Sequence, residues 1–139
     1  MTFFKTLLSA FLLCGTTICQ AQNASSPSII PLPAKIAQGE GVYTFKNKTT
    51  AWADAYAGDS IKMVLKQFQQ KFTQTTGLKW ANGKKNAALQ LKLNRNLGAE
   101  AYNLNVTPKG IVVEAARPAG FFYALQTLQQ LLPSRSVLA

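Results

Sequence analysis

Residues 101–115 carry the pattern that most restricts the fold of this chain. Tyr102, Leu104 and Val106 alternate with asparagines, which is the spacing of a strand with one buried face. Residues 107–110 then place proline second and glycine fourth, as in a β-turn, and an apolar run follows at once. The sequence therefore predicts a β-hairpin in this segment.

Two segments have the spacing of amphipathic helices. The first follows a possible cap at Asp59 and ends near Gly77, and the second starts near Pro118 and ends at Pro133. Their apolar positions recur every three or four residues and are Ile61, Val64, Leu65, Phe68 and Phe72 in the first, and Phe121, Leu125, Leu128 and Leu132 in the second. We expect each helix to bury one face.

The remaining strands are predicted from shorter patterns. Leucines alternate with polar residues at 89–93, and residues 42–45 and 49–52 are rich in β formers. Residues 80–86 are polar and are predicted to form a loop. The expected order is β-α-β-β-β-α, and the expected fold class is α+β, with a mainly antiparallel sheet and two amphipathic helices packed on one face.

The N-terminus has the pattern of a secretory signal peptide. Lys5 precedes a mostly apolar run, and Cys19 and Ala21 supply small residues at the −3 and −1 positions of a cleavage site. The run is shorter than the roughly 20 residues that a spanning helix needs, and neither Cys14 nor Cys19 follows the small residue of a lipid-anchor site. We expect a signal peptide at 1–21, an exported periplasmic or secreted protein, and no stable membrane anchor.

Removal of that segment leaves a mature chain with neither cysteine nor histidine, because both cysteines lie within it and the sequence has no histidine. This composition excludes a disulfide framework, Ser-His and Cys-His catalysis, and most zinc sites. We expect no metal and no cofactor. Residues 22–37 are predicted to form an extended Pro/Ser-rich leader, and residues 38–133 to form the α+β domain.

Several motifs resemble a known family. Residues 98–113 have the sequence GAEAYNLNVTPKGIVV, and residues 119–133 have AGFFYALQTLQQLLP. Before them, IIPLPAKI occupies 29–36 and GVYTF occupies 41–45. In this order they resemble, over residues 29–133, the N-terminal non-catalytic domain of bacterial β-N-acetylhexosaminidases, which form glycoside hydrolase family 20.

The resemblance implies an enzyme that removes terminal N-acetylhexosamine residues from glycans on an eight-stranded β/α barrel. In the family an adjacent Asp-Glu pair acts there, with Glu as general acid and Asp orienting the acetamido group of the substrate. A barrel takes about 250 residues, whereas only a tail at 134–139 follows here, and no two acidic residues are neighbours. We expect a fragment that is inactive alone, braces the catalytic barrel and meets glycan through it.

The acidic residues offer no independent catalytic pair. They are Glu40, Asp54, Asp59, Glu100 and Glu114. Glu40 lies in a glycine-rich turn, Asp59 occupies a cap position, and Glu114 ends a predicted strand. We therefore expect structural roles for the acids and assign no catalytic, cofactor-binding or metal-binding residue.

The basic composition supports an alternative function. The chain has 15 Lys plus Arg against 5 Asp plus Glu; Lys62 and Lys66 share a helical face, and Lys84 and Lys85 are adjacent. A free-standing exported module for anionic polymers or the cell envelope would use such lysines, although solvated lysines are the simpler interpretation. No nucleic-acid motif accompanies them, so we expect no nucleic-acid partner. A non-functional truncation product is a third possibility.

The consecutive aromatic residues Phe121, Phe122 and Tyr123 would point in three directions from a helix. We expect one of them in the core and another at the interface with the barrel, because exposed apolar surface more often marks a partner than a sugar-stacking platform. The same interpretation, core or domain interface, is given to Trp52 and Trp80.

Overall fold

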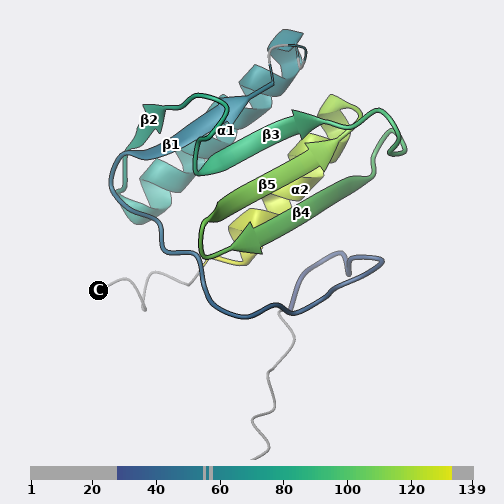
Figure 1. Cartoon of the computed structure of the whole chain (residues 1–139), viewed down its shortest axis with the longest axis horizontal. Helices are drawn as coiled ribbons and strands as arrows, with labels where there is room; N and C mark the ends of the chain where they lie inside the picture. Colours follow the sequence, from purple (N-terminus) through teal and green to yellow (C-terminus); the bar gives the residue numbers. More distant parts are fainter. Residues whose placement is uncertain (1–27, 55, 57, 133–139) are drawn as a thin grey trace, which may run out of the picture.

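The computed structural model describes residues 28–54, 56 and 58–132. In this part of the chain a five-stranded sheet is covered by two helices (Figure 1). The strands are β1 (Thr49–Ala53), β2 (Trp80–Asn82), β3 (Leu89–Leu93), β4 (Tyr102–Thr107) and β5 (Gly110–Ala115), and the helices are α1 (Gly58–Thr76) and α2 (Pro118–Gln130). The predicted signal peptide at 1–21 and tail at 134–139 lie outside the described residues.

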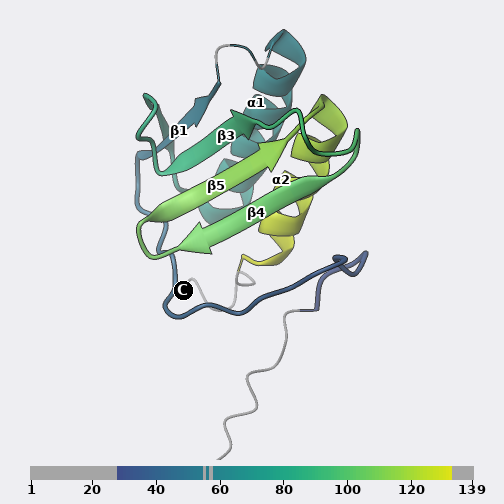
Figure 2. The ribbon, with the colours of Figure 1, turned by 45° about the vertical axis from the view of Figure 1, so that its right-hand side comes forward.

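Both helices pack on the same face of the sheet. The strand order is β2-β1-β3-β5-β4, and α1 and α2 lie side by side behind it, so the opposite face is left uncovered (Figures 1 and 2). Helix α2 contacts β4 and β5, helix α1 contacts β1, and the two helices contact each other. The predicted α+β fold, with two helices on one face, is confirmed.

The expectation of a mainly antiparallel sheet is wrong. β1 pairs in parallel with both β2 and β3, and β3 pairs in parallel with β5, so β4–β5 is the antiparallel pair among the described strands. Helix α1 carries the chain back to the end of the sheet where β1 began, so β2 and β3 run in the same direction as β1. The hairpin then places β5, rather than β4, beside β3.

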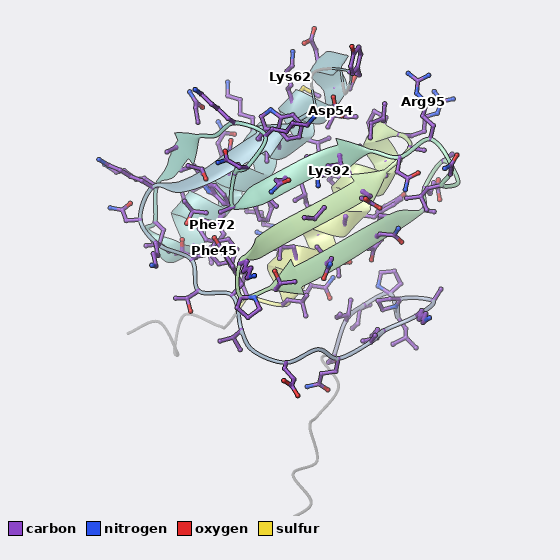
Figure 3. All side chains as sticks on the ribbon, in the orientation of Figure 1. Phe45, Asp54, Lys62, Phe72, Lys92 and Arg95 are labelled. Carbon is purple, nitrogen blue, oxygen red and sulfur yellow. The ribbon has the colours of Figure 1, made fainter. Side chains whose placement is uncertain are left out.

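Strand β2 is an addition to the predicted elements, and it lies in the segment that was predicted to be a loop. Its three residues pair with β1 at the edge of the sheet and are too few to show an alternating pattern. Residues 42–45, in contrast, form no strand. The rings of Phe45 and Phe72 nevertheless pack together, with centroids 4.7 Å apart, so the β-rich composition of this segment reflects burial rather than strand pairing (Figure 3).

The core lies between the sheet and the helices. Leu89, Leu91 and Val113, on the central strands, are completely buried. The helices add the positions that their spacing predicts, namely Ile61, Leu65, Phe68 and Phe72 from α1 and Phe121, Leu125 and Leu128 from α2. Val64 and Leu132 are half-buried at the margin of this core.

The beginning and the middle of the segment before β1 are each attached to the domain. Ile29 is buried, and the backbone of Ile30 is hydrogen-bonded to the side chain of Gln130 at the end of α2. Further along, Gly41 lies against Pro108 in the β4–β5 turn. Gly41 has φ +83°, and a Cβ there would lie 2.6 Å from the Cγ of Pro108, so this position requires glycine.

Candidate domain interface

The acidic residues lie on separate elements. Asp54, after β1, accepts a hydrogen bond from a backbone N–H at 3.1 Å, and Asp59, in the first turn of α1, pairs with a lysine side chain at 3.1 Å. Glu114, on β5, accepts hydrogen bonds from two asparagine amides at 3.3 Å. Glu40 and Glu100 are exposed. These contacts lie in a turn, at a helix start and on the sheet surface.

The described residues provide neither a metal-binding cluster nor a membrane-spanning helix. Within residues 28–54, 56 and 58–132, no three side chains of His, Cys, Asp or Glu are grouped so that they could hold a metal ion. No described helix has both the length and the apolar character needed to cross a membrane.

Helix α2 separates its three consecutive aromatic residues, as predicted. Phe121 points into the core and is completely buried, whereas Phe122 is 41% exposed and Tyr123 is 43% exposed. A rotation of about 100° per residue accounts for this difference. The exposed rings contact each other edge to face, with centroids 5.8 Å apart. Two neighbouring aromatic side chains therefore stand on the outer surface of α2.

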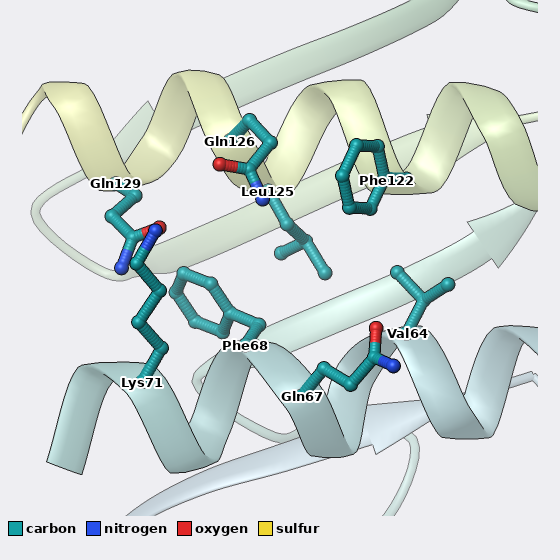
Figure 4. A pocket seen from close by; sticks show the side chains of 8 residues that line it. All are labelled: Val64, Gln67, Phe68, Lys71, Phe122, Leu125, Gln126 and Gln129. Carbon is teal, nitrogen blue, oxygen red and sulfur yellow. The ribbon is translucent and has the colours of Figure 1, made fainter. Parts of the chain in front are cut away.

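A groove of about 210 Å³ runs between α1 and α2 next to Phe122 (Figure 4). Its lining comes from both helices and consists of Val64, Gln67, Phe68, Lys71, Phe122, Leu125, Gln126 and Gln129. In Figure 4 the apolar side chains converge from the two helices, and the polar side chains flank them. An apolar centre with a polar margin is the usual composition of a surface that binds another protein domain.

Exposed apolar side chains are concentrated on the helix layer and on the segment before β1. Met63 on α1 is 57% exposed, and Leu131 just after α2 is 38% exposed. Ile30 and Leu32, in the segment attached to the end of α2, are 77% and 79% exposed. We use the name helix face for the exposed apolar side chains of the helix layer and its attached segment, namely Ile30, Leu32, Met63, Phe122, Tyr123 and Leu131.

The uncovered face of the sheet is more polar. The register places Gln90 beside Val112 and Lys92 beside Glu114, on the face opposite the buried leucines of β3. Trp52 pairs with Gln90 and therefore also lies on this face, outside the core. Trp80, in contrast, packs with the core aromatics at its margin, so only this tryptophan has the predicted core position.

A small α+β domain that leaves an apolar helix face unpartnered has the form of a domain that packs against a larger neighbour. The family described as glycosyl hydrolase family 20, domain 2, matches residues 26–138. The chain belongs to this family, which confirms the resemblance seen in the motifs of residues 29–133.

Solved structures give the same assignment. N-acetyl-β-hexosaminidase from Streptomyces plicatus is 28% identical with a TM-score of 0.69, and the match covers 76% of this chain and 21% of that one. β-N-acetylhexosaminidase from Bacteroides fragilis is 33% identical with a TM-score of 0.59, and the match covers 73% of this chain and 20% of that one. A family 20 exo-β-N-acetylglucosaminidase from Vibrio harveyi shares the fold. It is 24% identical with a TM-score of 0.65, and the match covers 74% of this chain and 16% of that one. The chain thus spans about a fifth of the length of these structures, or less.

Proposed function

We propose that this chain is the N-terminal accessory domain of an exported β-N-acetylhexosaminidase, which removes terminal N-acetylhexosamine residues from glycans. Membership of the family and the names of the similar solved structures support this assignment. The sequence pattern of residues 1–21 supports export. A free-standing basic module is not favoured, because the family match extends over residues 26–138 and no part of it points to a separate binding module.

The exposure of apolar side chains on the helix face is the observation that best supports this proposal. Phe122 and Tyr123 present two contiguous aromatic rings to solvent beside an apolar groove. Burial of apolar area contributes about 25 cal/mol per Å², so covering these rings with another domain would stabilise both partners. We assign the catalytic barrel of the enzyme as the domain that covers the helix face.

The domain itself has a bracing role and no chemistry. No two acidic residues of the chain are adjacent, so the family's Asp-Glu pair has no counterpart here. We expect the isolated chain to show no hydrolysis of an aryl N-acetylglucosaminide. Turnover that disappeared when one of the five acids was replaced by its amide would contradict this assignment.

A chimera tests the bracing role directly. Residues 28–132 would replace the matching domain of the Bacteroides fragilis enzyme, which is 33% identical. We expect Phe122→Glu with Tyr123→Glu to lower the thermal midpoint and the hydrolytic activity of the chimera. Asn105→Glu on the uncovered sheet face with Asn86→Glu in the exposed turn after β2 is the matched control, because it adds the same charge at exposed positions. Equal behaviour of the two double variants would show that the helix face does not contact the barrel.

A further inference from the structure

A second groove, shallower and more open to solvent than the first, lies on the other side of α1, between this helix and the edge strand β2. Its volume is about 530 Å³, and its lining includes Lys66, Gln69, Gln70 and Thr73 from α1 together with Lys79 and Trp80. It shares no residue with the groove of the helix face. A surface on this side of α1 is therefore separate from the surface assigned to the catalytic barrel.

On the strand side, the groove is lined by Lys79. The loop that precedes β1 is held beside Lys79, because the N–H of Lys48 donates to the carbonyl of Lys79 at 2.8 Å and the N–H of Lys79 donates to Asn47 Oδ1 at 3.1 Å. Lys84 and Lys85 follow β2 and are exposed, but they do not line the groove. The lysines that line it are Lys79 on the strand side and Lys66 on α1.

The acidic residues lie elsewhere. Asp54 follows the carboxyl end of β1, and Asp59 lies in the first turn of α1. Glu114, near the end of β5, and Glu100, just before β4, lie toward the other edge of the sheet. Glu40 precedes Gly41, which contacts the β4–β5 turn. The residues that line the groove include two lysines and no acid, so the formal charge of the lining is positive.

We propose that the groove between α1 and β2 binds a segment of an acidic glycan. Lys66 and Lys79 would contact the carboxylate or sulfate groups, while the amides of Gln69 and Gln70 would hydrogen-bond the sugar hydroxyls. The partly exposed ring of Trp80 supplies an apolar wall. Its indole N–H is buried and does not reach the groove surface, so a sugar would contact the exposed part of the ring rather than this N–H.

Glycan rather than nucleic acid is favoured by the character of the walls. Single-stranded nucleic acids are bound by exposed aromatic rings on which successive bases stack. Here Trp80 is the one aromatic ring in the lining, and its ring also packs on Phe72 with centroids 5.0 Å apart. The remaining described lining consists of amide, hydroxyl and ammonium groups, which suit hydroxylated, negatively charged sugars.

The test is a binding titration of the purified chain with heparin and with polygalacturonate, at two salt concentrations, followed by tryptophan fluorescence. We expect both polymers to bind at low salt and binding to weaken as salt rises. Lys66→Gln with Lys79→Gln should weaken binding at least tenfold. The matched control is Lys92→Gln with Lys109→Gln, which removes the same charge from the sheet face and the β4–β5 turn and should weaken binding less than threefold.

Three results would overturn the proposal. If neither heparin nor polygalacturonate bound the chain at low salt, the proposal would be wrong. Equal weakening by the two double variants would show that the net charge of the chain, rather than the groove, attracts the polymer. Tighter, variant-sensitive binding of a single-stranded DNA oligonucleotide would assign the groove to nucleic acid instead. All four lysines have exposed or half-buried side chains, and equal thermal midpoints of the variants would show that folding is preserved.

Discussion

The carboxamide of Gln130 makes two hydrogen bonds with the backbone of Ile30, although 100 residues separate them in the chain. The N–H of Ile30 donates to Gln130 Oε1 at 2.9 Å, and Gln130 Nε2 donates to the carbonyl of Ile30 at 2.8 Å. The neighbouring side chain of Ile29 is buried. Because one planar amide satisfies both the donor and the acceptor of a single residue, this contact positions the segment before β1 against the end of α2.

Replacing Gln130 by alanine should therefore release this segment. Gln130→Ala removes both hydrogen bonds, each worth about 0.5–1.5 kcal/mol, and we expect the free energy of unfolding to fall by about 1–2 kcal/mol. Limited proteolysis should cut faster near Ile30. Gln126→Ala, one turn earlier on α2, is the matched control because its amide makes no hydrogen bond with the described part of that segment. Equal cleavage of both variants would contradict the anchoring role.

Replacing each of two adjacent phenylalanines on α2 by alanine should change the stability of the domain by very different amounts. Phe121→Ala empties a completely buried site and should cost about 3–5 kcal/mol of stability in chemical denaturation. Phe122→Ala acts at a side chain that is 41% exposed and should change stability by less than about 1 kcal/mol. A large loss for Phe122→Ala in the isolated chain would mean that this ring supports the domain itself rather than a partner.

Gly120 should not tolerate a methyl group. A Cβ there would lie 2.5 Å from the carbonyl oxygen of Ala101 and 2.9 Å from the Cβ of Ala115. Although alanine favours helices by about 1 kcal/mol over glycine, we expect Gly120→Ala to destabilise the domain by about 1–3 kcal/mol through overpacking. Gly39→Ala, in open space, is the control for thermal unfolding. Equal midpoints for the two variants would show that α2 can shift away from the sheet.

Stability should decline at high pH through Tyr43. Burial raises the pKa of its hydroxyl above the usual value, while a hydrogen bond with Thr49 acts in the opposite direction. The unfolded chain would then lose this proton at lower pH than the folded domain does. The contribution is complete below the usual tyrosine pKa of about 10 and is lost as pH rises through the raised value.

Unfolding measured between pH 8 and about 11 tests this expectation for Tyr43. Tyr43→Phe should show a smaller decline in stability over this range than the unmodified chain. Tyr56→Phe replaces a tyrosine that is 84% exposed, and its profile should match that of the unmodified chain. A Tyr43→Phe profile with the full decline would show that other groups, such as lysines, cause the loss.

Local spacing was sufficient to predict the helices and the hairpin. The apolar positions of α1 and α2 recur with the helical period because one side of each helix is buried, and Phe121 was expected in the core on the same reasoning. Alternation in residues 102–106 predicted β4 for a similar reason. Motifs in residues 98–133 identified the family, since they span the hairpin and α2 in one continuous run.

Strand pairing could not be predicted from these patterns. Alternation assigns the faces of a strand but not its neighbours, so the parallel pairing of β3 with β5 emerged only when the hairpin was placed in the sheet. Strand β2 has three residues and exists through its pairing with β1. Residues 42–45 have strand-like composition, yet they lack a partner strand and pack through Tyr43 and Phe45 instead.

The sequence by itself determined which faces of the helices are buried, that residues 22–139 contain no thiol or imidazole, and which family the chain resembles. Those properties depend on residue types and their local spacing. Only the tertiary structure decided that Phe122 lines a groove between α1 and α2, and that Lys66 and Lys79 line another. Such surfaces join residues that are distant in the chain, and packing of the helices on the sheet brings them together.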